Sequence, residues 1–371
     1  FTGRSGASKR HNSFGHYRHN IPAYLLKGKV RQMAARKQTI FFRNRPYITS
    51  SCSIAGKKEG DGPMANWFDI CLEDDTYGEP TWEKSESKML KTAMTEAIRK
   101  GGLQNDDIGA MLSGDLLNQL MSSSFMARDL HIPFLGMYGA CSTMTESLIM
   151  GSVLTDGGYS DNVMIGASSH YCTAERQFRM PLEHGNQRPP SAQWTATAAG
   201  AMLITGRADS RRTEADVRGS VRKHSHIRVE SATVGKIIDA GVKDANQMGS
   251  AMAPAAVDTI LNHLQDTGRR LDHYDAVFTG DLGFIGKDIV KDLLEDAGIP
   301  HSQIEHVYDD CGCMIYEPEQ DVHSGGSGCG CSASVFAGYV YKKMRKGEIK
   351  RALLISTGAL LSTISPFQGE S

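Results

Sequence analysis

The sequence lacks long apolar runs and any excess of charge of one sign. No stretch approaches the roughly 18 consecutive apolar residues that a membrane-spanning helix needs. The 41 basic and 42 acidic side chains give a formal net charge of −1, which excludes a global electrostatic attraction to nucleic acid or to an anionic membrane. We therefore expect no nucleic-acid partner and no transmembrane segment, so that any membrane contact is peripheral.

Acidic residues are missing from the start of the chain, where basic residues gather. The first acidic residue is Glu59, whereas nine lysines and arginines occur before residue 38. Because such a segment has too little apolar surface to pack, residues 1–37 are predicted to form a basic, disordered N-terminal extension. Contact with acidic lipid head groups, contact with an acidic partner and the absence of any role remain open alternatives.

Cysteines are sparse, with eight spread over 371 residues. This spacing is unlike that of a small disulfide-stapled secreted domain, and no signal peptide precedes them, so a reducing compartment is expected. Two Cys-x-Cys pairs, at 311/313 and 329/331, raise a zinc hypothesis. The one-residue spacing is tighter than that of structural zinc sites, and no metal site is predicted.

Short apolar runs alternate with amphipathic stretches through most of the chain. Strands are predicted at 110–115, 134–138, 162–167 and 198–205, with helices at 116–130 and 141–155. The second half gives strands at 225–229, 233–237, 276–281, 305–308 and 351–357, with helices at 251–264, 287–297 and 332–346. This alternation favours a mainly parallel sheet that is covered by helices on both faces.

A short motif that occurs twice indicates an internal duplication. Ser-Gly-Asp-Leu at 113–116 has a counterpart in Thr-Gly-Asp-Leu at 279–282, each between a strand and a helix. Two βαβαβ half-domains are therefore predicted, at 38–215 and 216–371. The strand at 198–205 has no counterpart in the second half, which is predicted to lack its last strand.

The stretch around Cys141 is the leading candidate for chemistry. Cys141 follows a short strand and two small residues and begins a predicted helix. A thiol in the first helical turn lies near unpaired N–H groups and the positive end of the helix dipole, and both favour the nucleophilic thiolate. Ser142 is small enough to let a ligand approach the sulfur. The alternative is a free cysteine packed as a small hydrophobe.

A glycine-rich loop follows His323. Four glycines lie within residues 325–330, and such a density suggests positive φ angles or close approach of the backbone to a ligand. His323 is a candidate general base, and Gly326 and Cys329 are candidate ligand contacts. A flexible surface loop with an incidental histidine is the alternative.

Other polar candidates follow predicted strands. His170, Arg176 and Arg179 lie in a long polar loop after the strand at 162–167, where two arginines three residues apart could receive a carboxylate or phosphate. An ion-pair network is the alternative for the arginines. Asp115 and Asp281 stand at the carboxyl ends of predicted strands, where α/β sheets build their sites, and helix capping is the alternative for both.

Five motifs together resemble the stage V sporulation protein AD family of spore-forming bacteria. They are Ser-Gly-Asp-Leu-Leu-Asn-Gln (113–119), Gly-Ala-Cys-Ser-Thr (139–143), Ala-Glu-Arg-Gln-Phe-Arg (174–179), His-Ser-Gly-Gly-Ser-Gly-Cys-Gly-Cys-Ser-Ala (323–333) and Ser-Thr-Gly-Ala-Leu-Leu-Ser (356–362). More broadly, the chain looks like the thiolase and ketoacyl-synthase superfamily. The resemblance implies a thiolase-like fold in which the duplicated halves form a layered α/β/α/β/α core, and it implies a homodimer.

The same resemblance implies a function in sporulation. The family is understood to bind dipicolinate (pyridine-2,6-dicarboxylate) during its uptake into the developing spore. The implied partners are the other SpoVA membrane proteins, with a peripheral location at the forespore or spore inner membrane. No cofactor is implied beyond the calcium that could accompany dipicolinate. The alternative is a Cys-dependent acyltransferase similar to ketoacyl synthases.

Site residues carry over from the superfamily with departures. Cys141 sits where condensing enzymes place their nucleophile, and His323 resembles a catalytic histidine whose following proline is replaced by Ser324. Asp281 stands near an expected histidine position, and Cys329 stands where an asparagine is expected. Cys141 and His323 are therefore interpreted as a vestigial catalytic pair. The predicted ligand-binding set is Cys141, Ser142, His170, Arg176, Arg179, Asp281, His323, Gly326 and Cys329.

Overall fold

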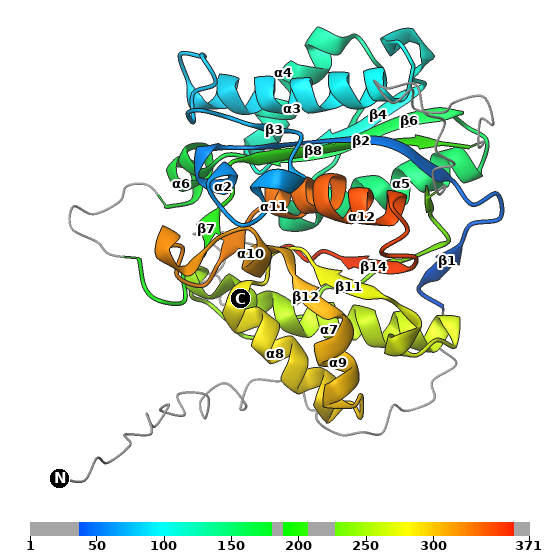
Figure 1. Ribbon diagram of the computed structural model, residues 1–371, viewed down its shortest axis with the longest axis vertical. Helices are drawn as coiled ribbons and strands as arrows, with labels where there is room; N and C mark the ends of the chain where they lie inside the picture. Colours follow the sequence, from blue (N-terminus) through cyan, green and yellow to red (C-terminus); the bar gives the residue numbers. More distant parts are fainter. Residues whose placement is uncertain (1–36, 180–187, 207–226, 360–371) are drawn as a thin grey trace.

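Two β-sheets lie one above the other, with one layer of helices between them and another outside each (Figure 1). The computed structural model describes residues 37–179, 188–206 and 227–359. Outside the larger sheet lie α3 (Trp82–Lys100) and α4 (Met121–Leu130). Between the sheets lie α5 (Thr143–Asp156), α11 (Cys329–Val335) and α12 (Tyr341–Arg345). Outside the smaller sheet lie α7 (Met248–Thr267) and α8 (Gly283–Asp296). The layering is therefore α/β/α/β/α.

Within the described ranges the larger sheet has seven strands. Their order is β3 (Ile70–Cys71), β2 (Tyr47–Ala55), β8 (Ala198–Thr205), β6 (Asn162–Ser169), β4 (Ala110–Gly114) and β5 (Phe134–Gly136), with β9 (Ile227–Arg228) beside β2. Strand β8 runs antiparallel between β2 and β6, so that Ala201 pairs with Cys52 on one side and Gly166 on the other. All eight residues of β8 are buried, because α3 and α11 cover its two faces.

The smaller sheet has three parallel strands among the described residues. Their order is β12 (Tyr308–Asp310), β11 (Ala276–Thr279) and β14 (Ala352–Ile355). Nearby, β1 (Thr39–Phe41) pairs antiparallel with β10 (Ser231–Thr233). In the larger sheet β8 separates β2 from β6, but within the described ranges no strand lies between β10 and β14. Two strand edges in the second half therefore border an open slot.

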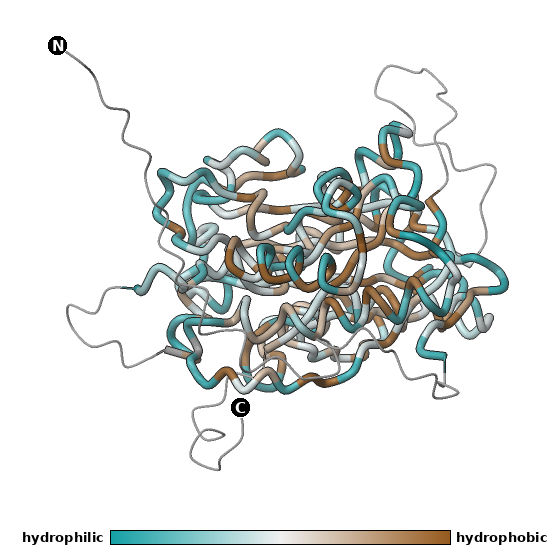
Figure 2. The backbone as a smooth tube through the Cα atoms, turned by 90° about the horizontal axis from the view of Figure 1, so that it is seen from below, coloured by the Kyte–Doolittle hydropathy of each residue, from teal (hydrophilic) through white to brown (hydrophobic). Residues whose placement is uncertain are grey.

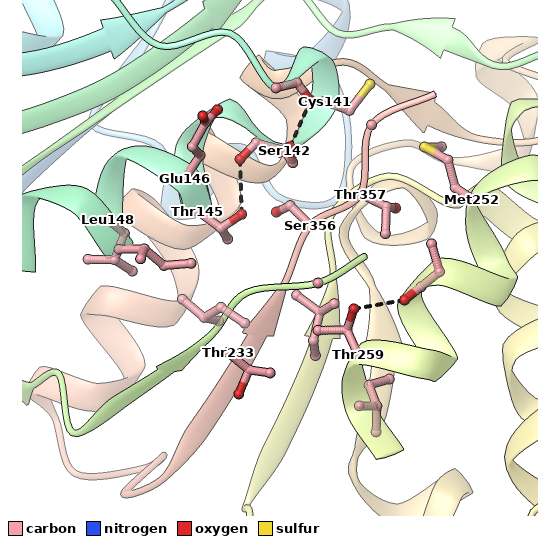
Figure 3. A pocket seen from close by; sticks show the side chains of 18 of the residues that line it. Cys141, Ser142, Thr145, Glu146, Leu148, Thr233, Met252, Thr259, Ser356 and Thr357 are labelled. Atoms are coloured by element: carbon pink, nitrogen blue, oxygen red, sulfur yellow. Dashed lines mark hydrogen bonds between the residues drawn. The ribbon is translucent and has the colours of Figure 1, made fainter. Parts of the chain in front are cut away.

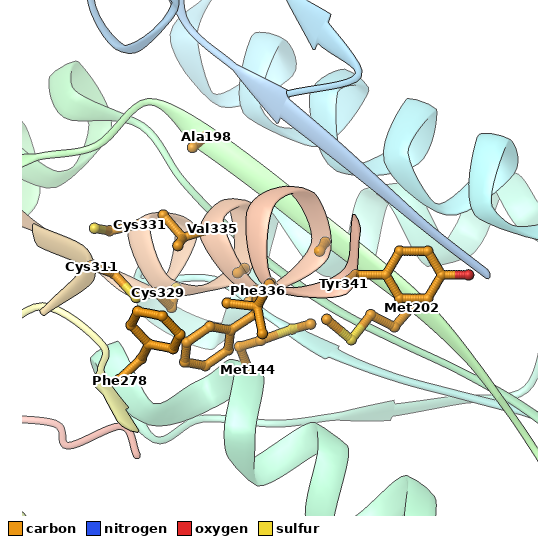
Figure 4. Packing of buried hydrophobic residues seen from close by; sticks show 14 of the residues in the cluster. Met144, Ala198, Met202, Phe278, Cys311, Cys329, Cys331, Val335, Phe336 and Tyr341 are labelled. Carbon is orange, nitrogen blue, oxygen red and sulfur yellow. The ribbon is translucent and has the colours of Figure 1, made fainter. Parts of the chain in front are cut away.

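The central core surrounds α11 and the π-helical turn Phe336–Val340 that continues it. Every residue of α11 is buried, and Phe336 packs with Met144 from α5 and Phe278 from β11 (Figure 4). This helix is apolar or small on all sides because it lies between two sheets rather than at the surface. Hydrophilic segments gather on the outer loops (Figure 2).

Two predicted strands differ from the structure. The sequence predicts a strand at residues 305–308, but α9 (His301–Val307) occupies most of that stretch, and β12 begins only at Tyr308. Pro300 precedes the helix as its N-cap residue and has the extended conformation typical of such a position. The strand expected at 233–237 ends at Thr233, and Ile237 is fully exposed.

Some expectations fall outside the described ranges. The predicted basic extension lies there except for Lys37.

Among the helices that the structure describes, none combines the length and the apolar character needed to cross a membrane.

Candidate functional site

The Cys141 elbow joins strand β5 to helix α5. A 3-10 turn, Ala140–Ser142, precedes the helix, and Ala140 has a φ of 49°, which is unusual for a residue other than glycine. Gly358 packs so closely that a Cβ there would lie 2.2 Å from the Gly139 carbonyl oxygen. Cys141 is therefore held in a crowded turn, and only 6% of its surface is exposed.

The Cys141 thiol faces the carboxyl group of Asp281. Burial raises the pKa of the thiol well above its ordinary value, and the Asp281 charge raises this pKa further. The helix-terminus prediction of a favoured thiolate is therefore wrong, because desolvation and a carboxylate outweigh the helix dipole. Burial also raises the pKa of Asp281 to about 7. Both members of the pair are therefore weak acids in the fold.

Cys329 lies beside this pair at the start of α11. Its Sγ donates to the Ser168 carbonyl oxygen at 3.0 Å, and burial raises its pKa well above the ordinary value. Two further buried carboxyl groups, Glu86 and Asp115, contribute to this raised pKa. The structure therefore brings together three of the predicted residues, Cys141, Asp281 and Cys329, in an environment of acids.

His323 makes its contacts elsewhere. Its Nδ1 lies 2.9 Å from the Pro189 carbonyl oxygen, and its Nε2 lies 3.0 Å from Asp321 Oδ1. Both ring nitrogens are engaged in these contacts, so neither serves Cys141 as a base. The structure does not join the predicted pair of Cys141 and His323.

Both ring nitrogens of His170 form hydrogen bonds with backbone groups. Its Nδ1 accepts from the Cys172 N–H at 3.1 Å, so the ring proton is on Nε2, which donates to the Asp75 carbonyl oxygen at 2.8 Å. Burial lowers the pKa of His170 and keeps the ring neutral. These contacts support a structural role.

The predicted arginines lie on α6 (Tyr171–Arg179). Arg176 forms an ion pair with Glu83 and lies over the Trp82 ring, 5.8 Å from its centroid. The side chain of Arg179 is outside the part of the chain that the structure describes. Gly326 belongs to β13 (Gly326–Ser327), where its carbonyl oxygen accepts from Gln193 Nε2 at 2.7 Å.

A cavity of about 1190 Å³ opens beside the elbow (Figure 3). Cys141 and Ser142 line one end, and the cavity continues between β10 and β14, with α5 and α7 as its other walls. Glu146 Oε2 and Ser356 Oγ are buried there without a hydrogen-bond partner among the described residues. The cavity fills the gap between the edges of β10 and β14, so the arrangement of these strands accounts for much of its shape.

A second polar cluster was missed by sequence reasoning. Trp194 of β7 (Trp194–Thr195) stacks on Tyr171, with ring centroids 3.7 Å apart and planes 6° from parallel. Lys58 Nζ lies 3.9 Å and Arg188 Cζ 4.9 Å from the same indole centroid. These residues come from distant parts of the chain, so no local motif could have revealed the cluster.

The two Cys-x-Cys pairs do not form a metal centre in the structure. Within residues 37–179, 188–206 and 227–359, no group of three or more His, Cys, Asp or Glu side chains is arranged to hold a metal ion. Cys311, Cys329 and Cys331 are instead fully buried in the central core.

Comparisons with known proteins identify relatives at two levels. The family described as Stage V sporulation protein AD matches residues 36–371. The protein of that name from Bacillus subtilis (strain 168) is 43% identical over 326 residues, which cover 88% of this chain and 91% of the relative.

Solved structures support the fold class. The 3-oxoacyl-[acyl-carrier-protein] synthase III from Aquifex aeolicus VF5 matches with a TM-score of 0.51 and 13% identity, over 85% of this chain and 96% of that chain. Cerulenin-bound OleA from Xanthomonas campestris matches with a TM-score of 0.54 and 12% identity, over 88% and 96%. These likenesses show the fold alone, and they confirm the predicted thiolase-like class.

Proposed function

Since this chain belongs to the stage V sporulation protein AD family, we propose that it binds dipicolinate and serves dipicolinate uptake into the developing spore without catalysing acyl transfer. Family membership itself gives a role in sporulation. The ligand, the uptake step and the absence of catalysis are the proposal.

The observation that carries the non-catalytic part is the pairing of Cys141 with Asp281. Acyl transfer through cysteine needs a thiolate, usually formed by a neighbouring base. Here burial and Asp281 raise the pKa of the thiol, and His323 contacts Pro189 and Asp321 instead. Cys329 donates its thiol hydrogen to Ser168, so it offers no donor to a thioester carbonyl.

The proposal extends to location and partners. We expect the protein to act at the forespore or spore inner membrane with the other SpoVA membrane proteins, and calcium to accompany the ligand. Homodimer formation through β5 is supported by the position of this strand at the sheet edge and by its exposed Leu135.

Isothermal titration of the full chain with dipicolinate, with and without calcium, tests the ligand. We expect saturable binding that benzene-1,3-dicarboxylate, which lacks the ring nitrogen, reproduces only weakly. If the titration gives no heat of binding, and no other ligand competes with dipicolinate for the protein, the proposal is ruled out.

The alternative function is acyl transfer, which is favoured by the position of Cys141 at the end of a cavity. Incubation with an acyl-CoA followed by intact-mass measurement decides between the two. We expect no adduct, and an acyl group that is lost in a Cys141→Ser variant would establish the alternative instead.

A further inference from the structure

We propose that one edge of the molecule docks on an anionic lipid surface through Arg45, Arg228 and Lys350, three cations that line a depression here called the basic groove. The inference rests on the membrane location in the proposed function and deepens it by naming the surface that meets the lipid. Each of the three cations comes from a different part of the chain.

The fold brings these three segments together. Arg45 lies in the turn between β1 and β2, Arg228 ends β9, and Lys350 lies between α12 and β14. Strand β9 pairs antiparallel with β2, so Arg228 stands opposite Tyr47, and its Cζ lies 5.1 Å from the Tyr47 ring centroid. The three exposed cations line one depression of about 340 Å³, where the turn after β1 and the turn before β14 lie on the same side of the molecule (Figure 1).

The fold does not neutralise the positive charge of the basic groove. None of its three cations forms an ion pair with another described residue. Glu230 also lines the groove, but its carboxylate is already paired with Arg269 Nη2 at 3.0 Å. Elsewhere acidic residues prevail, because residues 38–371 hold 32 basic and 42 acidic side chains. Unpaired positive charge gathered on an otherwise acidic body indicates an anionic partner.

Further cations continue the charge along this edge. Arg43 precedes Arg45 by two residues, Arg351 follows Lys350, and both are exposed. Residues 1–36, which lead toward β1, contain eight lysines and arginines and no acidic residue. A broad anionic surface can engage such a row of cations together, whereas one small anion can contact only a few of them.

Exposed apolar side chains border the basic groove. Strand β1 lies beside it, because the Phe42 N–H donates to the Glu230 carbonyl oxygen at 3.1 Å. On this strand Ile40 exposes 40% and Phe41 48% of its surface. At a bilayer, apolar side chains enter the interface while neighbouring lysines and arginines meet the head groups. An acidic protein surface would not need these apolar groups, so they favour lipid as the partner.

Docking through the basic groove would orient the large cavity. Arg228, Glu230 and Lys350 line that cavity as well as the groove. The two depressions therefore adjoin at this edge of the molecule. A protein docked here would hold one end of the cavity close to the membrane and to the membrane proteins proposed as its partners.

Co-sedimentation of the full-length chain with vesicles tests the surface. Wild-type protein should bind vesicles made of equal parts of phosphatidylcholine and phosphatidylglycerol but not vesicles of phosphatidylcholine alone, and added salt should release it. Arg45→Gln, Arg228→Gln and Lys350→Gln should each weaken binding about fivefold, as expected for one cation near an anionic membrane. Lys84→Gln is the matched control, because Lys84 is also exposed and has no ion pair within the described ranges. It should bind like the wild type.

Variants of Phe41 separate lipid from an acidic protein. Phe41→Ser should weaken vesicle binding about fivefold, because less apolar surface enters the interface. Phe41→Trp should strengthen binding about twofold, because tryptophan favours the membrane interface, and misfolding cannot imitate this gain. If soluble polyglutamate displaces the wild-type chain from vesicles and both Phe41 variants bind like the wild type, the groove takes an acidic protein and the lipid surface is overturned.

The remaining outcomes are equally decisive. Equal binding by the three groove variants and Lys84→Gln overturns the surface, and so does equal binding of the wild type to neutral and anionic vesicles. All variants keep residues 1–36, so the charge of that segment is the same in each. Titration with dipicolinate in the absence of lipid is a separate measurement. A chain that binds dipicolinate but no anionic vesicles loses this surface and keeps the proposed ligand, and the reverse result does the opposite.

Discussion

The backbone N–H of Gly328 donates to Asp281 Oδ2 at 2.7 Å. This hydrogen bond ties Asp281, two residues beyond the end of β11, to the N-cap of α11, both in the second half of the chain. The same carboxyl group raises the pKa of Cys141 in the first half. The Asp281 carboxyl group is therefore held in a fixed position, and its effect on the thiol should be measurable where it is ionised.

The reactivity of Cys141 should increase when Asp281 is neutralised. In Asp281→Asn the negative charge that raises the thiol pKa is absent, so more thiolate forms at a given pH. The rate of carboxymethylation at Cys141, followed by peptide mass spectrometry at about pH 8, should rise. Cys52, a distant buried thiol whose pKa burial raises to about 12, is the internal control. An unchanged rate at Cys141 would contradict the proposed influence of Asp281.

Stability should fall as the pH rises from mildly acidic to neutral. Burial raises the folded-state pKa values of Glu59 and Asp281 to about 7, from ordinary values of 4.5 and 3.8. Between these limits the folded protein binds more protons than the unfolded chain, so the free energy of unfolding decreases with pH by about 1.4 kcal/mol per unit and group.

Urea unfolding between about pH 5 and pH 8 checks this dependence. Glu59→Gln keeps the acceptor for Tyr316 and Thr197 but cannot ionise, so its stability should vary less with pH. Glu319→Gln, at an exposed position, should keep the wild-type slope. A wild-type protein that becomes more stable toward pH 8 would show that these carboxyl groups are not protonated in the fold.

The contact between β8 and α11 should tolerate no side chain at Gly200. A Cβ at this position would lie 2.0 Å from the Ala333 carbonyl oxygen, a backbone atom that cannot move without shifting the helix. Gly200→Ala should therefore lower the free energy of unfolding by about 1–3 kcal/mol or more. Gly206→Ala, where the nearest atom is 3.4 Å away, should be nearly neutral, and equal losses in the two variants would refute the argument.

The exposed edge of the larger sheet predicts a dimer. Strand β5 pairs only with β4 among the described strands, and Leu135 and Tyr138 each expose 53% of their surface. Leu135→Lys should place a charge in the edge-to-edge interface and give a monomer in size-exclusion chromatography with light scattering. Tyr159→Lys, at a residue that is 81% exposed, should not change the mass. A monomeric wild-type chain would contradict the prediction.

The layered fold could be predicted because its signals are local. Apolar runs such as Ala198–Thr205 are buried on both faces, and their length and small residues are enough to indicate strands. Residues 305–308, Glu-His-Val-Tyr, misled the prediction because so short a stretch fits a helix end as well as a strand. The N-capping position of Pro300 was the better signal.

The chemistry of the site was less predictable because it depends on burial. The sequence places Cys141 at a helix start, but only the fold shows that Asp281 faces it and that solvent is excluded. Likewise, nothing local connects Lys58, Arg188 and Trp194. Lys58 meets Trp194 because the Gly56 N–H donates to the Thr197 carbonyl oxygen at 2.6 Å, which places the chain before Lys58 beside the end of β7.

The stacked indole of Trp194 also gives the protein a built-in chromophore. The chain has three tryptophans, and the other two, Trp67 and Trp82, lie over different cations. With Trp67→Phe and Trp82→Phe, all remaining indole fluorescence would arise from the ring that carries Lys58 and Arg188. Any change in the contacts of that ring would change the emission, so this part of the fold could be followed in solution, in real time and without a label.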